Sequence, residues 1–173
     1  ASRALEIDPT LAEAHAAVGL YYSNMQMWKD AEESYRKAIG FNPNYPLGHE
    51  WLSSVLIGTG RLDEGAHEIN VAERLDPLSL RPKVLSAWHL YQSRNYPEAL
   101  AKAEEIYELS PEFMQANLQL ANILLAIGEN VRAFQASERA VEAAGDSALP
   151  IYMLAFAAAA LGEAFGVFRL PHR

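Results

Sequence analysis

Four prolines recur along this 173-residue chain at one interval of 34 residues: Pro9, Pro43, Pro77 and Pro111. Each follows an apolar residue and a small polar one, and the next step of the interval lands on Gly145, another helix breaker. Because proline cannot donate the backbone hydrogen bond of an interior helical residue, it separates one group of helices from the next. A period of this length is typical of proteins built from repeated helix pairs.

Small residues follow the same period at other positions of the repeat. Gly60, Gly128 and Gly162 share one register, with Arg94 in the slot between the first two, and there we expect the left-handed turn that ends a first helix. Two more registers hold residues small enough to let two helices approach closely. They are Gly19, Ser53, Ala87, Ala121 and Ala155, and then Ala31, Gly65, Ala99 and Ala133. Abundant alanine and sparse β-branched residues also favour helix.

One stretch makes a family resemblance specific. Residues 15–22 read His-Ala-Ala-Val-Gly-Leu-Tyr-Tyr, and Ala31, Tyr35, Ala38 and Pro43 follow at set distances. This resembles the tetratricopeptide repeat pattern W-x-x-L-G-x-x-Y, A-x-x-x-F, A and P, with histidine in the tryptophan position and valine in the leucine position. The resemblance covers nearly the whole chain. It implies an all-α, right-handed α-solenoid of antiparallel helix pairs, a TPR-like superhelix without strands, in which neighbouring pairs stabilise one another.

The period also predicts how the chain is divided. We expect residues 1–173 to form a single TPR-like solenoid. Its expected parts are a partial repeat at 1–11, full repeats at 12–45, 46–79, 80–113 and 114–147, and a partial repeat at 148–170. The chain begins at Ala1 and lacks a charged segment followed by an apolar one, so we expect a fragment or a processed product.

The charge balance argues against two classes of partner. The chain has 14 Lys and Arg against 22 Asp and Glu, a formal charge of −8, and an acidic surface repels nucleic-acid phosphates. The apolar stretch 148–170 is broken at Gly162, short of the roughly 20 residues that a membrane-spanning helix needs. We therefore expect neither a nucleic acid nor a membrane as partner. The absence of cysteine leaves the compartment open, with the cytoplasm favoured.

No residue pattern predicts catalysis. The five histidines form no metal-binding helix motif. His15 and His49 share a register and could approach each other, but two imidazoles without a carboxylate or thiolate beside the pair make a poor metal site. We interpret them as packing or groove residues. Gly58-Thr59-Gly60 lacks the lysine and the preceding strand of a phosphate-binding loop. The sequence therefore predicts a protein that is not an enzyme, with no catalytic residue, metal or cofactor.

The resemblance implies where a partner would bind. In this family the first helices line a concave groove that takes peptides or helices, and here those positions are rich in aromatic residues and poor in charge. The candidate groove residues are Glu50, Trp51, Ser54, Arg81, Leu85, Trp88, Tyr91, Gln115, Leu118, Gln119 and Asn122, preceded in the first repeat by Glu13, Ala17, Leu20 and Ser23. The Lys/Asn/Arg set with which chaperone-binding members hold a carboxylate is missing. We predict that replacing Trp51 or Trp88 by alanine weakens partner binding and costs under about 1 kcal/mol of stability, whereas a tryptophan in a core would cost roughly 3–5 kcal/mol.

Two functions remain open from the sequence. The first is a protein–protein interaction scaffold that binds an apolar or amphipathic segment of a partner protein or peptide in the groove. The alternative is an architectural or self-association segment of a larger bacterial signalling or regulatory protein, which rests on analogy. The last first helix is apolar nearly all round and expects cover. We therefore predict a homodimer through the C-terminal end, by way of Tyr152, Phe156 and Phe165, which light scattering at several concentrations would detect.

Overall fold

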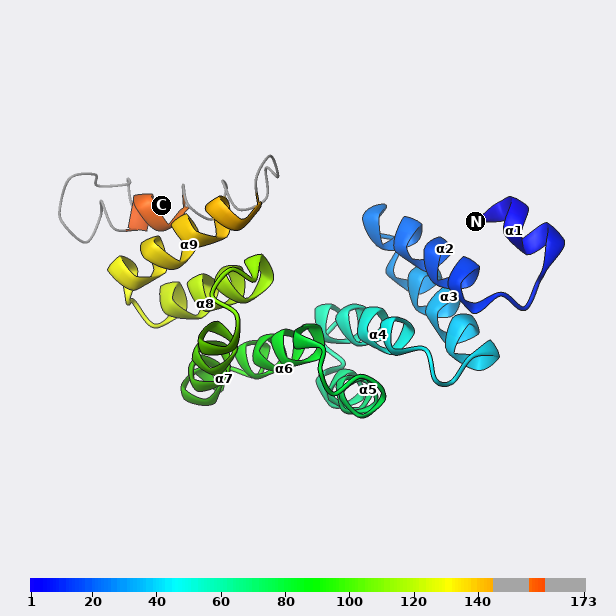
Figure 1. Ribbon diagram of the computed structural model, residues 1–173, viewed down its shortest axis with the longest axis horizontal. Coiled ribbons are helices and arrows are strands. Elements are labelled where there is room, and N and C mark those ends of the chain that lie inside the picture. Colours follow the sequence, from blue (N-terminus) through cyan, green and yellow to red (C-terminus); the bar gives the residue numbers. More distant parts are fainter. Residues whose placement is uncertain (145–155, 161–173) are drawn as a thin grey trace. The chain divides into compact units, whose positions relative to one another are not determined.

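The computed structural model describes residues 1–144 and 156–160 of the chain (Figure 1). Every regular element within these residues is a helix, which confirms the predicted all-α fold. The helices are α1 Ser2–Ile7, α2 Ala12–Asn24, α3 Trp28–Phe41, α4 Pro46–Gly58, α5 Leu62–Leu75, α6 Leu80–Gln92, α7 Tyr96–Leu109, α8 Met114–Ala126 and α9 Asn130–Ala144. Residues 156–160 are also helical. The chain separates into two compact units, residues 1–93 and 94–173.

The first unit is a stack of helix pairs. α2 packs against α3 and α4 against α5, each pair joined by a short turn, while α1 contacts α2 (Figure 1). Successive pairs join through contacts of α3 with α4 and of α5 with α6. The first helices also touch one another, α2 with α4 and α4 with α6. These three helices therefore form one continuous surface, called here the first-helix face.

The second unit follows the same plan. α8 packs against α9 as a helix pair, and α7 packs against α8 (Figure 1). The predicted fifth first helix, at 148–161, falls mostly outside the described residues. The helical segment 156–160 belongs to this unit, and Nδ2 of Asn130 in α9 donates a hydrogen bond of 3.2 Å to the carbonyl of Ala160.

The prolines mark the helix ends as predicted. α3, α5 and α7 each end two residues before a proline of the 34-residue series. The residue after each helix donates its backbone N–H to the carbonyl four residues earlier, so the chain leaves the helix with its last hydrogen bond made. Pro46 begins α4 and Pro97 is the second residue of α7, positions where the missing N–H has no partner to lose.

The turns inside the helix pairs need a left-handed residue, and not all of them use glycine. Gly60 and Gly128 have φ of 84° and 82°, as predicted, while Gln26 and Arg94 occupy the same register with φ of 57° and 58°. A side chain at such a φ costs about 1–2 kcal/mol. In the first turn the N–H of Met27 bonds the carbonyl of Tyr22 at 2.9 Å, the long-range hydrogen bond of a Schellman motif. Gly162 lies outside the described residues.

The small-residue registers are buried where helices approach. A Cβ added to Gly19 would lie 2.5 Å from Cε1 of Tyr35, and one added to Gly65 would lie 2.5 Å from Cγ1 of Ile57. Both distances are too short for real atoms. The alanines that hold these registers in the other repeats are fully buried: Ala31, Ala87, Ala99, Ala121 and Ala133. Ala155 is not among the described residues.

The histidines in the tryptophan position of the repeat have a structural role. Nε2 of His15 donates to the carbonyl of Pro9 at 2.8 Å, and Nε2 of His49 donates to the carbonyl of Pro43 at 3.0 Å. In the fourth repeat Nδ2 of Asn117 donates to the carbonyl of Pro111 at 2.6 Å. A polar donor at this position therefore ties α2, α4 and α8 to the proline turns that precede them.

Candidate functional site

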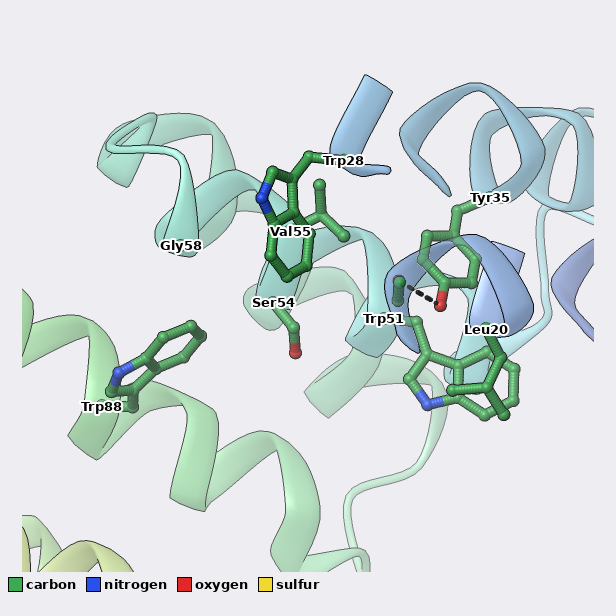
Figure 2. Close-up of a pocket in the computed structure, with 9 residues that line it drawn as sticks. Leu20, Trp28, Tyr35, Trp51, Ser54, Val55, Gly58 and Trp88 are labelled. Atoms are coloured by element: carbon green, nitrogen blue, oxygen red, sulfur yellow. Dashed lines mark hydrogen bonds between the residues drawn. The ribbon is translucent and has the colours of Figure 1, made fainter. Parts of the chain in front are cut away.

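All three tryptophans of the chain line one hollow of about 430 Å³ in the first unit. The hollow lies on the first-helix face and is called here the aromatic hollow (Figure 2). Its volume falls in the range of about 300–1,000 Å³ that is usual for ligand sites. It is lined by Leu20, Ser23, Trp28, Tyr35, Trp51, Ser54, Val55, Gly58 and Trp88.

Helix geometry explains how these side chains converge. Trp51, Ser54, Val55 and Gly58 are spaced three, four and seven residues apart on α4, so they lie along one face of that helix. Trp88 reaches the hollow from α6 (Figure 2). A Cβ at Gly58 would stand 3.8 Å from Cη2 of Trp88, so the glycine leaves space beside the indole ring.

Tyr35 forms the floor of the hollow. Its ring is buried, lies 5.8 Å from the ring of Trp51 between centroids, and belongs to a core cluster with Leu52, Val55 and their neighbours. Its hydroxyl is 3.0 Å from the hydroxyl of Ser23, and the two share a hydrogen bond (Figure 2). Burial raises the pKa of Tyr35, so the phenol stays neutral.

The hydroxyl groups around the hollow are satisfied from within the protein. Ser23 and Tyr35 bond each other, and the hydroxyl of Ser54 donates to the carbonyl of Glu50 at 3.0 Å. The lining contains no Lys, Arg, Asp, Glu or His side chain. The hollow therefore offers carbon surface and aromatic faces, and a bound group needs no charge to fit it.

Trp28 is a site residue that the sequence did not predict. It is 46% exposed at the first position of α3, while Trp51 and Trp88 are half-buried. The family resemblance assigns the groove to first helices, and Trp28 belongs to a second helix. A comparison of the second-helix starts would have found it, because the equivalent residues are Leu62, Tyr96 and Asn130.

The prediction that Glu50 lines the groove is wrong. Its side chain is buried instead of lining an open groove, and Nε of Arg81 donates to its Oε2 at 2.6 Å. Arg81 is therefore committed to an internal ion pair. Burial, together with the carboxylates of Glu13 and Glu50, raises the pKa of Tyr45, which places Glu13 close to the same end of the first-helix face.

The remaining predicted residues fall into separate groups. In the first unit Leu85 and Tyr91 are half-buried on α6. In the second unit Gln115 is exposed, Leu118 and Asn122 are half-buried, and Gln119 is buried on α8. Of the proposed self-association residues, Phe156 is 66% exposed. Tyr152 and Phe165 lie outside the described residues.

The second unit has its own hollow, of about 440 Å³, between α7, α8 and α9. Its cations already have partners: Arg132 forms an ion pair with Glu104. The guanidinium of Arg139 lies 4.7 Å from the ring centroid of Tyr107 and its Nε donates to Oδ1 of Asn117. These contacts stabilise the helix packing and hold both arginines within the second unit.

His49 has a carboxylate partner that the sequence did not reveal. Nδ1 of His49 donates to Oε2 of Glu68 at 2.6 Å, while Nε2 donates to Pro43, so both ring nitrogens carry hydrogen. Burial of the ring lowers its pKa, but the hydrogen bonds to Glu68 and Pro43 and the charge of Glu68 outweigh burial, and the pKa of His49 is raised. The bond joins α4 to α5, within one helix pair.

This pair predicts a dependence of stability on pH. A histidine whose pKa is raised by folding adds stability that is complete below its unfolded pKa and is lost as pH rises through the folded value. We therefore expect the free energy of unfolding to be highest below about pH 6.5, the ordinary pKa of histidine, and to fall as the pH rises above it. The fall should be smaller in Glu68→Gln, which removes the charge that holds the proton. Urea titrations at several pH values measure it, and equal pH profiles for the two proteins would contradict the assignment.

No group of three His, Cys, Asp or Glu side chains is placed to bind a metal ion within residues 1–144 and 156–160. Across the same part of the chain, no helix is both long enough and apolar enough to cross a membrane. The apolar stretch 148–170 falls mostly outside it.

Comparison with known proteins points to one family. Residues 84–148 match the family model described as tetratricopeptide repeat. Anaphase-promoting complex subunit 3 of Schizosaccharomyces pombe is 23% identical over 153 residues, which cover 88% of this chain and 23% of that protein. The chain thus spans about a quarter of the length of this curated relative.

Solved structures share the fold. A thermophilic tetratricopeptide repeat protein of Thermus thermophilus has a TM-score of 0.79 at 20% identity, over 92% of this chain and 86% of that one. YrrB, a repeat protein with an unusual peptide-binding site, has a TM-score of 0.60 at 16% identity, over 91% of this chain and 81% of that one. At such identities the likeness shows the fold.

Proposed function

This chain belongs to the tetratricopeptide repeat family, and we propose that its first unit binds an apolar segment of a partner protein on the first-helix face. The observation that carries the proposal is the convergence of Trp28, Trp51 and Trp88 on one hollow. Tryptophan is enriched among the residues that supply most of the energy of protein interfaces. Exposed apolar surface of this kind is typical of sites that a partner covers.

The relatives support a binding role in general terms. Repeats of this family commonly mediate protein–protein interactions, and YrrB carries a peptide-binding site. The S. pombe relative is by name a subunit of a multiprotein complex. Members of the family are generally scaffolds, and we propose that this chain also acts by binding without catalysis. The second-unit residues Gln115, Leu118 and Asn122 remain proposed contacts of the same kind, whereas the side chain of Gln119 is buried.

Self-association is a second candidate. The observation that favours it is the large exposed ring of Phe156 in the segment 156–160. An architectural role in a larger protein would use the same end of the chain. Dimerisation through Tyr152, Phe156 and Phe165 stays a prediction.

The proposed function predicts that replacing a tryptophan of the hollow weakens peptide binding, and that the cost in stability depends on how far each side chain is buried. Peptides selected from a random dodecamer library on the immobilised chain serve as probes. We expect Trp28→Ala and Trp88→Ala to weaken peptide binding at least about tenfold, since hot-spot truncations often cost 2 kcal/mol or more. Trp28→Ala should cost under about 1 kcal/mol of stability, because the side chain is half exposed.

Trp51→Ala needs a separate expectation. Its ring packs against the core cluster around Tyr35, so we expect a stability loss of about 2 kcal/mol in addition to weaker binding. Leu78→Ser is the matched control, since Leu78 is 92% exposed in the turn before α6 and does not line the hollow. Peptides that bind Trp28→Ala and Trp88→Ala as tightly as the unmodified chain would refute the proposed site.

A further inference from the structure

The turn between α2 and α3 is chemically unlike its three equivalents. It reads Met25-Gln26-Met27-Trp28, called here the methionine tip. The corresponding turns read Thr59-Gly60-Arg61-Leu62, Ser93-Arg94-Asn95-Tyr96 and Ile127-Gly128-Glu129-Asn130. Where the first turn has Met27, the others have arginine, asparagine or glutamate. The repeat plan does not require this apolar residue, because Arg61 and Glu129 make the equivalent turn hydrogen bonds in its place.

The methionine tip is exposed and adjoins the aromatic hollow. Met25 is 57% exposed and Met27 45%, and Tyr21, on the last turns of α2, is 57% exposed. Trp28 belongs to both the tip and the hollow lining, and Leu20, next to Tyr21, lines the hollow as well. The apolar surface therefore continues from the hollow over the end of the first helix pair. Methionine side chains are flexible and adapt to varied apolar partners.

The second turn shows what a polar residue does at the same place. Arg61 donates to Glu32 at 2.6 Å and to Glu64 at 2.5 Å, and so joins α3 to the start of α5. Met27 can form no such ion pair. Its exposure is thus unexplained by packing within the first unit, and a partner that covers it would gain the burial of apolar surface.

The charges around the hollow and the methionine tip limit which side chains a partner segment can carry there. Neither the hollow lining nor the four residues of the tip include an ionised side chain, so a charge placed there would lose its water without gaining a counter-charge. Lys29, directly after Trp28 on α3, is exposed, but it lies four residues before Glu33 and interacts with that carboxylate. Along α2 the nearest charge to Leu20 is negative. Glu13 is exposed and lies seven residues before Leu20 on the same face of α2, about 10 Å away along the helix. Glu50, at the same end, is already neutralised by Arg81.

We propose that the aromatic hollow and the methionine tip form one docking surface for a partner segment with at least two large apolar side chains and a lysine or arginine facing Glu13. The proposal rests on the proposed function and specifies its partner. A span of about 10 Å corresponds to about three residues of an extended segment or about seven of a helical one. The apolar side chains fill the hollow and cover Met25 and Met27, while the basic residue lies near the start of α2.

The test uses dodecamer peptides selected on the full chain from a random library. The expected sequences are rich in leucine, methionine or phenylalanine, with Lys or Arg at one of the two spacings. The double variant Met25→Ser, Met27→Asn gives the first turn, at these two positions, the residues of the third turn. We expect it to bind these peptides at least about tenfold more weakly. Its thermal unfolding should be unchanged, because both side chains are exposed.

Glu13→Lys tests the charge. We expect binding to weaken several-fold at low salt and less at high salt, as for any exposed ion pair. Leu78→Ser should bind as the unmodified chain does. Selected apolar peptides that need Trp28 but carry an acidic residue in place of the basic one, or that tolerate the double tip variant or Glu13→Lys, would overturn this inference while the proposed function stands. Peptides that need neither Trp28 nor Trp88 would overturn both.

Discussion

Replacing Ala99 with arginine is expected to lower the free energy of unfolding by about 3 kcal/mol or more. Ala99 is fully buried in α7, in the same register as Ala31, Gly65 and Ala133. An arginine there would overpack the close helix contact and bury a charge without a partner. Urea unfolding followed by circular dichroism measures the loss.

Ala101 provides the control for this change. It lies two residues later on the same helix and is exposed, so Ala101→Arg carries the same substitution into solvent. We expect its effect to stay within about 0.5 kcal/mol. If Ala99→Arg also cost less than about 0.5 kcal/mol, the 34-residue register of close contacts would be wrong. If both variants lost the same free energy of unfolding, the cause would be the presence of an arginine in α7 and not its burial at position 99.

Tyr35→Ala is expected to cost roughly 3–5 kcal/mol, the range for removal of a large core ring. The ring fills the space that Gly19 leaves open and packs beside Trp51, so its loss creates a cavity under the aromatic hollow. Tyr35→Phe keeps the ring and removes only the hydroxyl. We expect that change to cost about 1 kcal/mol, since Ser23 loses its hydrogen-bond partner.

Denaturant unfolding of the two Tyr35 variants separates packing from hydrogen bonding. Losses of similar size in both would mean that the hydroxyl, and not the ring, stabilises the first unit. A loss below about 1 kcal/mol in Tyr35→Ala would show that the core closes over the missing ring. That outcome would also contradict the role of the Tyr35 ring as the floor of the aromatic hollow.

The helix plan was predictable because it depends on local chemistry repeated many times. Proline at Pro43, Pro77 and Pro111 ends helices wherever it falls, and small residues at close contacts obey the same steric limit in each repeat. Two turns depart from the predicted glycine pattern. Gln26 adopts a left-handed φ without glycine because the packed pair of α2 and α3 fixes its turn, and Arg94 has a similar φ at the equivalent position.

The candidate site was only partly predictable, because it depends on side chains from different helices that meet in the fold, and the repeat period does not show which side chains meet. Trp51 and Trp88 follow from the groove positions of first helices, but Trp28 belongs to a second helix. Glu50 looks like a solvated acid in sequence. It is buried because Arg81, on the neighbouring first helix, supplies the counter-charge. The division of the chain into repeats and the self-association of its C-terminal end stay predictions.

Tryptophan fluorescence offers the most direct measurement of the central claim. All three tryptophans line the aromatic hollow, so the emission of the unmodified chain reports on that site alone. A selected peptide that occupies the hollow should displace water from the indole rings and shift the emission to shorter wavelength. The shift should be half complete at a free peptide concentration equal to the Kd found by calorimetry. A peptide that saturates the chain by calorimetry and leaves the emission spectrum unchanged would show that the partner binds elsewhere.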